Sequence, residues 1–120
     1  MRPLLLAAVL ALALAASARA TERSEAQRQT LADLAYVLGQ SHALRQACQG
    51  QADQFWRERM YRLIETEQAD QGLERRLKDS FNAGYANAQA AYPACSAQSR
   101  RAETRAAERG RALVAGLEGE

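Results

Sequence analysis

Apolar residues after residue 20 recur every three or four positions in four successive segments, the spacing of amphipathic helices. No run of alternating polar and β-branched residues predicts a strand, and Pro93 is the only proline in this part of the chain. Short connections between the segments favour antiparallel neighbours. We therefore expect an all-α fold, an up-down antiparallel bundle of three core helices plus a C-terminal fourth helix.

The first helix is expected over about residues 24–49. Ser24 and Gln27 have the spacing of a capping box, and Gly50 suits a helix end. One face of this helix carries a mainly apolar stripe, which comprises Leu31, Leu34, Leu38, Arg45 and Cys48.

The second helix is expected over about residues 53–68 with Asp53 as its N-cap, and the third over about residues 72–92, ending before Pro93. The stripe of the second helix comprises Trp56, Met60, Leu63, Ile64 and Glu67. The stripe of the third comprises Leu73, Leu77, Phe81, Gly84, Tyr85, Ala88 and Tyr92.

The fourth helix is expected over about residues 97–117, with Ser96 as its cap. Its first half is mostly charged residues and alanine, and only Leu113, Val114 and Leu117 give it a firm apolar edge. We expect a loosely packed covering helix whose outer face lies in solvent.

The first 20 residues have the pattern of a secretory signal peptide. Arg2 precedes an unbroken apolar run over residues 4–16, and Ala18-Arg19-Ala20 is a cleavage signal. A helix of that run is about 20 Å long, shorter than the ~30 Å hydrocarbon core of a membrane. The sequence predicts cleavage after Ala20, export to the periplasm and a single helical domain over residues 21–120, without an integral membrane anchor.

Removal of the leader makes the domain formally neutral. Arg2 and Arg19 are lost, which leaves 14 basic residues against 14 acidic ones. Interspersed charges without a net excess give no electrostatic attraction for nucleic acid or for anionic lipid. We expect neither as a partner.

Cys48 and Cys95 are the only cysteines, and an even pair in a small exported domain predicts a disulfide. The alternatives are free, redox-active or intermolecular thiols, although no C-x-x-C motif is present. An up-down-up order places the end of the first helix level with the residue just past the third. A bridge closing a loop of about 48 residues stabilises by about 4 kcal/mol in the chain-entropy model.

Catalytic patterns are sparse. His42 is the only histidine, and on one helix it is separated from Cys48 by about 9 Å of rise and about 120° of rotation, so the two cannot form a nucleophilic pair. No histidine spacing predicts a zinc site. We expect no metal, no cofactor and no enzymatic activity; the enzymatic alternative has His42 as general base.

Polar and aromatic residues on or near the apolar stripes form a candidate binding or polar-core cluster: His42, Arg45, Trp56, Glu67, Tyr85 and Tyr92. In one interpretation Arg45 packs over Tyr92 or Trp56, and Glu67 accepts from Tyr36 or from the start of the third helix. In the other, some of these residues line a ligand pocket. Phe55 lies off the stripe, and its exposure would indicate a contact surface.

Three segments, LGQSHALRQAC at 38–48, WRERMYRLIETE at 56–67 and FNAGYANAQAAYPAC at 81–95, resemble an uncharacterised family of small exported proteins from alphaproteobacteria, a domain of unknown function. The resemblance covers about residues 31–95. It implies a leader and the motifs L-G-x-x-H-x-L-R-x-x-C, W-R-x-x-M and F-N-x-G-Y, without an activity. The matching residues are Leu38, Gly39, His42, Leu44, Arg45, Cys48, Trp56, Arg57, Met60, Phe81, Asn82, Gly84 and Tyr85.

Two functional hypotheses follow. The first is a periplasmic envelope accessory or adaptor that acts through contacts with another envelope protein. The second is a small-ligand-binding bundle whose pocket is lined by His42, Arg45 and the tyrosines of the third helix. The identity of a partner or ligand is not encoded in any motif.

Overall fold

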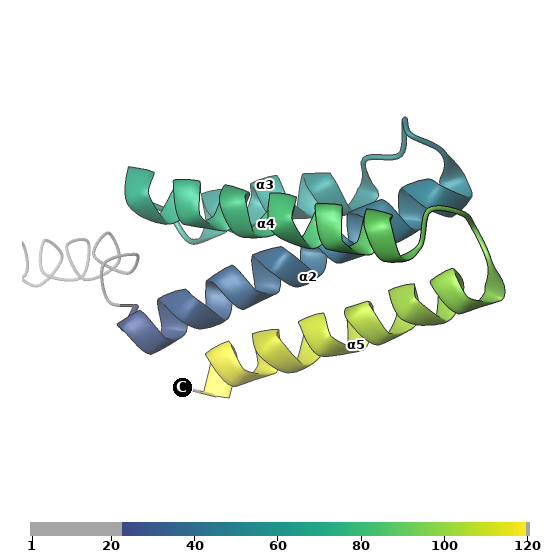
Figure 1. The fold of residues 1–120 in the computed structure, drawn as a ribbon. Helices are drawn as coiled ribbons and strands as arrows, with labels where there is room; N and C mark the ends of the chain where they lie inside the picture. Colours follow the sequence, from purple (N-terminus) through teal and green to yellow (C-terminus); the bar gives the residue numbers. More distant parts are fainter. Residues whose placement is uncertain (1–22, 120) are drawn as a thin grey trace, which may run out of the picture.

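The computed structural model describes residues 23–119, and these residues form a bundle of four α-helices without strands. The helices are α2 (Glu25–Gln49), α3 (Phe55–Thr66), α4 (Gln71–Ala91) and α5 (Ala97–Gly119). Successive helices alternate in direction, so α2 and α4 run one way and α3 and α5 the other (Figure 1). The predicted all-α bundle is confirmed. The expected signal peptide lies outside the described residues.

The capping chemistry explains where α2 begins and ends and where α4 begins. Ser24 and Gln27 form the expected capping box, and Gly50 ends α2 with a φ of 103°, which favours glycine. Asp70 is the N-cap of α4, where its carboxylate accepts from the backbone N–H of Leu73 at 2.8 Å. These ends lie within one or two residues of the predicted ones.

The predicted N-cap of α3 is wrong by one residue. Gln54 occupies that position without a side-chain capping bond. Asp53 accepts from the backbone N–H of Phe55 at 3.1 Å and also receives Nε of Arg45 at 3.0 Å. The Asp53 carboxylate thus accepts a hydrogen bond from the first residue of α3 and also pairs with Arg45 of α2.

The main core lies between α2, the inner helix, and its neighbours α3 and α4. Residues four, four, three and four positions apart place one face of α4 in this interior. The buried residues of α4 are Leu73, Leu77, Phe81, Gly84 and Ala88. The main core comprises Leu31, Ala32, Leu34, Ala35, Leu38, Met60, Leu73, Leu77 and Phe81, with Trp56, Leu63, Ile64, Leu113 and Leu117 packed against it.

Two glycines allow the backbones of α2 and α4 to touch where the helices cross. A Cβ atom added at Gly39 would lie 1.9 Å from the carbonyl oxygen of Phe81, and one at Gly84 would lie 2.0 Å from that of Tyr36. No side chain fits at either position. The glycines of the L-G and F-N-x-G-Y segments therefore set the separation of these two helices.

α5 packs along α2 through small residues. Its buried residues are Ser99, Ala102 and Ala106, followed on the same face by Gly110, Leu113 and Leu117. The expected apolar edge is therefore only partly right: Leu113 and Leu117 are half-buried, whereas Val114 is 38% exposed. Because alanine and serine side chains are small, this face of α5 lies close to α2 and is buried against it.

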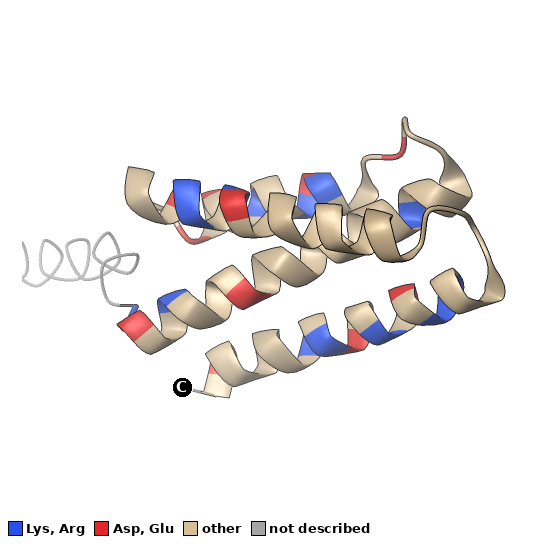
Figure 2. Ribbon diagram, in the orientation of Figure 1, with Lys and Arg blue, Asp and Glu red and all other residues tan. Residues whose placement is uncertain are grey.

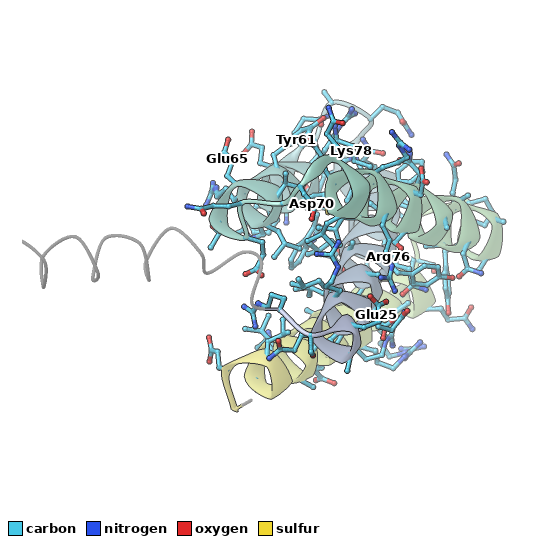
Figure 3. The ribbon with its side chains drawn as sticks, turned by 90° about the vertical axis from the view of Figure 1, so that its left-hand side faces the viewer. Glu25, Tyr61, Glu65, Asp70, Arg76 and Lys78 are labelled. Atoms are coloured by element: carbon cyan, nitrogen blue, oxygen red, sulfur yellow. A yellow bond between two sulfur atoms is a disulfide. The ribbon has the colours of Figure 1, made fainter. Side chains whose placement is uncertain are left out.

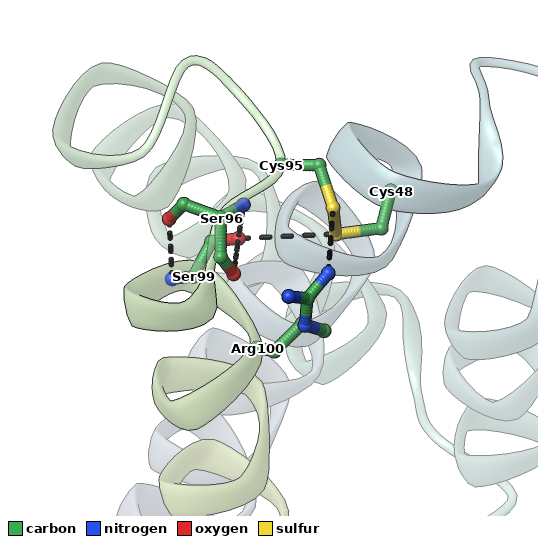
Figure 4. Close-up of a disulfide and its surroundings, with 5 residues drawn as sticks. All are labelled: Cys48, Cys95, Ser96, Ser99 and Arg100. Atoms are coloured by element: carbon green, nitrogen blue, oxygen red, sulfur yellow. Dashed lines mark hydrogen bonds between the residues drawn. A yellow bond between two sulfur atoms is a disulfide. The ribbon is translucent and has the colours of Figure 1, made fainter.

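A disulfide joins Cys48, near the end of α2, to Cys95 in the connection before α5, as predicted (Figure 4). Ser96 and Ser99 cap α5 reciprocally: the N–H of Ser96 donates to Oγ of Ser99 at 2.8 Å, and the N–H of Ser99 donates to Oγ of Ser96 at 2.9 Å. Oγ of Ser99 also lies 3.8 Å from Sγ of Cys48. The bridge and the start of α5 thus form one contact.

Charges are distributed unevenly over the helices. α5 carries interspersed basic and acidic side chains, whereas all charges of α4 lie in its first half (Figure 2). None of the described helices combines the length and the apolar character needed to cross a membrane.

Candidate functional site

A cleft of about 560 Å³ opens between α3 and α4, with α2 as its floor. Helical spacing explains its composition, because three or four positions separate the residues that one face of each helix contributes. The residues that line this "His42 cleft" are His42, Gln46, Gln51, Gln54, Arg57, Met60, Tyr61, Lys78, Phe81, Asn82 and Tyr85. Its volume lies in the range of small-molecule sites.

His42 forms the aromatic part of the floor and is only 4% exposed. Its ring centroid lies 5.6 Å from that of Phe81 and 5.3 Å from that of Tyr85. Nδ1 is buried and has no hydrogen-bond partner among the described residues. Burial, followed by the positive charge of Arg57, lowers the pKa of His42, and Asp53 opposes this shift. The imidazole is therefore neutral at pH 7.

A fixed hydrogen-bond network holds the neighbouring part of the floor. The hydroxyl of Tyr85 donates to Oε1 of Gln46 at 2.6 Å. Nε2 of Gln46 donates to the carbonyl oxygens of Gln51 at 2.8 Å and Asp53 at 3.3 Å. These bonds orient the amide and the phenol without a ligand. The floor is thus preorganised.

The rim carries two cations on facing helices. Arg57 of α3 donates from Nε to the hydroxyl of Tyr61 at 3.3 Å and makes no salt bridge with a described carboxylate. Lys78 of α4 pairs with Glu74 at 3.1 Å, and both side chains of that pair are well exposed. Figure 3 shows Tyr61 and Lys78 on the same outer side of the molecule. No carboxylate in the described part of the chain lines the cleft.

Only part of the sequence-predicted cluster meets at this site. His42 and Tyr85 lie together in the cleft, whereas Arg45 does not line it. The expected contacts of Arg45 with Tyr92 or Trp56 are replaced by Asp53, and by Phe55, whose ring centroid lies 4.4 Å from Cζ. Arg45 turns toward these residues because the connection after α2 places a carboxylate beside it.

Glu67 lies at the other end of α3, outside the cleft. It binds neither Tyr36 nor the start of α4; instead Arg23 donates to its two carboxylate oxygens at 2.8 and 3.1 Å. This bidentate pair ties the end of α3 to the residue before the capping box of α2. The expected partner of Glu67 is therefore corrected.

Trp56 and Tyr92, the remaining aromatic residues of the cluster, pack against the cores and do not line the cleft. Trp56 packs against the main core, although its buried Nε1 has no partner among the described residues. Tyr92 packs against a second small core of Ala43, Leu44, Ala88 and Ala102. Phe55 is 36% exposed, and the guanidinium of Arg59 lies 3.5 Å from its ring centroid.

Reasoning from the sequence missed the rim of the cleft. Arg57, Tyr61 and Lys78 lie on polar faces that the helical pattern assigns to solvent. A usable signal was the i, i+3, i+4 spacing of Arg57, Met60 and Tyr61, which places a buried methionine between polar neighbours. The same spacing recurs at Lys78, Phe81 and Asn82.

The chemistry of the cleft suits binding. Its walls offer guanidinium, ammonium and amide donors, and its interior offers the apolar surfaces of Met60 and Phe81. Within residues 23–119, no group of three or more histidine, cysteine or acidic side chains is placed to hold a metal ion.

Comparison with known proteins gives one match. Residues 26–119 match the family described as "Protein of unknown function (DUF2385)". No curated protein and no solved structure matches the chain.

Proposed function

We propose a function for this chain as a member of the DUF2385 family, to which it belongs by the match over residues 26–119. It is an exported, non-enzymatic binding protein of the periplasm, and its ligand is a small molecule held in the His42 cleft. One observation carries the proposal: a cleft of about 560 Å³ has a preorganised floor around a histidine that is 4% exposed and unpartnered at Nδ1 among the described residues.

The composition of the cleft favours binding over catalysis. A catalytic imidazole typically works with a serine, cysteine or threonine nucleophile and with a carboxylate that orients it, and none of these side chains in residues 23–119 lines the cleft. Both cysteines are joined to each other at the end of α2, and neither lines the cleft. Aromatic and amide groups around a neutral histidine are suited to holding a ligand by stacking and hydrogen bonds.

Export is supported by the leader-like sequence of residues 1–20 and by the disulfide, which persists in an oxidising compartment. Fractionation of cells that produce the full chain tests this proposal. We expect a periplasmic product that begins at Thr21 and has no alkylatable thiol without reductant. A cytoplasmic product with two reactive thiols would contradict export.

Ligand binding is tested by nuclear magnetic resonance with a fragment library of neutral, cationic and anionic compounds. We expect fragment-induced shifts to concentrate on the residues of the cleft. Asn82→Trp places a bulky ring in the cleft and should abolish these shifts. Ala83→Trp, one residue further along α4 and outside the cleft, is the matched control. The proposal would be wrong if the fragments bind only outside the cleft or if no fragment binds.

A protein-binding adaptor is the second candidate. The exposure of Phe55 at 36% and of Tyr61 at 46% favours it, because exposed aromatic side chains are common in protein interfaces. A photo-crosslinking residue at position 55 should capture one defined envelope protein in cells, whereas the same residue at the exposed position 105 of α5 should not. Equal labelling at both positions would argue against this candidate.

A further inference from the structure

The His42 cleft has a one-sided charge distribution. Arg57 and Lys78 line it from opposite walls, and no acidic residue within residues 23–119 does so. The remaining polar groups are the imidazole of His42, four amides and two phenols. A cleft with cationic walls and a low-dielectric floor concentrates negative charge.

Arg57 is the clearest candidate for an anion contact. Every salt bridge identified in residues 23–119 leaves it out, although four other arginines of this region are paired. Its Nε bond to Tyr61 and the 5.8 Å separation of Cζ from that ring orient the guanidinium beside the cleft. The guanidinium fork is suited to bidentate binding of carboxylate or phosphate oxygens.

The opposite wall can adapt to an anion at small cost. Lys78 and Glu74 form an exposed i, i+4 pair, and such exposed pairs contribute little to stability. An anion in the cleft can therefore draw the Lys78 ammonium away from Glu74. Lys78 then contributes a second positive charge from α4.

The apolar interior indicates what the anionic group is attached to. Met60 and Phe81 line the cleft and are 3% and 7% exposed, and the ring of Phe81 lies beside that of His42. Such surfaces bind an apolar or aromatic body, and Gln51, Gln54 and Asn82 offer hydrogen bonds to polar substituents.

We propose that the His42 cleft binds a small organic anion, with its carboxylate-like group at Arg57 and its apolar body over Met60 and Phe81. This inference rests on the proposed function and names its ligand class. Phosphate and carboxylate share the chemistry that Arg57 recognises.

The test uses matched pairs of probes, phenylacetate with phenylacetamide and phenyl phosphate with phenol, titrated into the oxidised protein and followed by amide shifts. We expect each anion to bind the cleft on the order of fivefold more tightly than its neutral partner. Arg57→Gln should remove that preference. Arg62→Gln, which deletes an exposed arginine of α3 outside the cleft, should leave it unchanged.

A second measurement tests the role of His42 as the floor. The charged groups around it are Arg57 on α3, Asp53 in the preceding connection and Lys78 on the α4 wall. A bound anion raises the pKa of His42, so proton uptake and anion binding favour one another. Phenylacetate, whose carboxylate stays ionised over this range, should therefore bind more tightly as pH falls from about 7 toward about 5.5, and His42→Gln should abolish this dependence.

The outcomes separate the two proposals. If an anion and its neutral partner bind the cleft with equal affinity, as judged from the amide shifts, the anion inference is overturned and the binding function stands. If no probe or library fragment shifts those residues, both are overturned. If His42→Gln retains the wild-type pH dependence, the proposed coupling between anion binding and protonation of His42 is wrong.

Discussion

α2 packs against α4 on one side and α5 on another, and the two contacts are built from residues of different size. α4 buries Leu73, Leu77 and Phe81, with Gly84 at the point where the backbones touch. α5 buries only Ser99, Ala102 and Ala106. Burying a leucine or phenylalanine side chain stabilises by about 1.5–3 kcal/mol, whereas an alanine contributes much less. The α4 contact is therefore held by its own core, and the α5 contact depends more on its tether.

The comparison also concerns glycine. At Gly84 a methyl group would meet backbone, whereas at Gly110 it would lie 3.7 Å from Val37 and 3.8 Å from Leu34, an ordinary contact distance. The same residue type thus has opposite consequences on the two sides. Helix propensity alone assigns both the same cost.

Removing the disulfide should have the largest effect. The double variant Cys48→Ser and Cys95→Ser is expected to lose about 4 kcal/mol of unfolding free energy, because the bridge restricts the unfolded chain. Urea denaturation measures the total loss. Hydrogen exchange should show a greater loss of protection in α5 than in α4, since α5 begins beside the bridge. Equal losses in both helices would remove the distinction drawn between them.

Gly84→Ala should have the next largest effect. Its Cβ would lie 2.0 Å from the carbonyl oxygen of Tyr36, so α2 and α4 must separate. We expect a loss of about 3 kcal/mol despite the better helix propensity of alanine, measured by urea denaturation. Ala83→Gly, at an exposed position of the same helix, is a control for propensity and should cost only about 1 kcal/mol. A Gly84→Ala protein as stable as the wild type would refute the backbone contact.

Gly110→Ala should change stability in the opposite direction. The added methyl group meets Val37 and Leu34 at contact distance, and alanine favours the helix. We expect a gain of up to about 1 kcal/mol in unfolding free energy. Thermal unfolding of Gly110→Ala beside Gly84→Ala tests the contrast directly. A loss comparable to that of Gly84→Ala would mean that α5 lies as close to α2 as α4 does.

Acid should weaken the start of α4 more than the start of α5. This is the smallest of the four expected effects. The backbone N–H of Leu73, followed by Arg28, holds the pKa of Asp70 below its usual range. The contribution of ionised Asp70 to the free energy of unfolding is present above its pKa in the unfolded chain, about 3.9. It is lost as pH falls through the lower pKa of the folded state. Ser96, which caps α5, does not titrate.

Asp70→Asn tests this difference, because asparagine keeps the capping geometry without a proton to gain. Between about pH 5 and about pH 2, its unfolding midpoint should fall less than that of the wild type. Ser96→Ala should leave the acid dependence unchanged while lowering stability at every pH. Parallel acid profiles for wild type and Asp70→Asn would contradict the assignment.

The helices and the bridge could be predicted because local chemistry determines them. The Ser24 capping box, the stripe that includes Leu73 and Leu77, and the equal level of Cys48 and Cys95 all follow from helical spacing and short connections. The packing of α5 could not be predicted in the same way. Ala102 and Ala106 carry little apolar signal, and their burial depends on the distance between two helices remote in sequence.

The candidate site was predictable only at its floor. Tyr85 lies on the apolar stripe of its helix and His42 lies beside that of the first helix, so their convergence follows from the bundle. Whether Arg57 and Lys78 face water or a cleft depends on how far α3 stands from α4, which no local pattern encodes. Arg45 pairs with Asp53 and Glu67 pairs with Arg23, and neither partner belongs to a predicted apolar stripe.

The position of the bridge gives the chain a second covalent path. Through Cys48 and Cys95, α2 is followed almost at once by α5, as in a helical hairpin, while α3 and α4 form a closed ring attached at that junction. A proteolytic cut in the connection between α3 and α4 would open this ring and leave one molecule. α5 would keep its short link to α2, so its packing need not await the folding of the segment that separates the two helices in sequence.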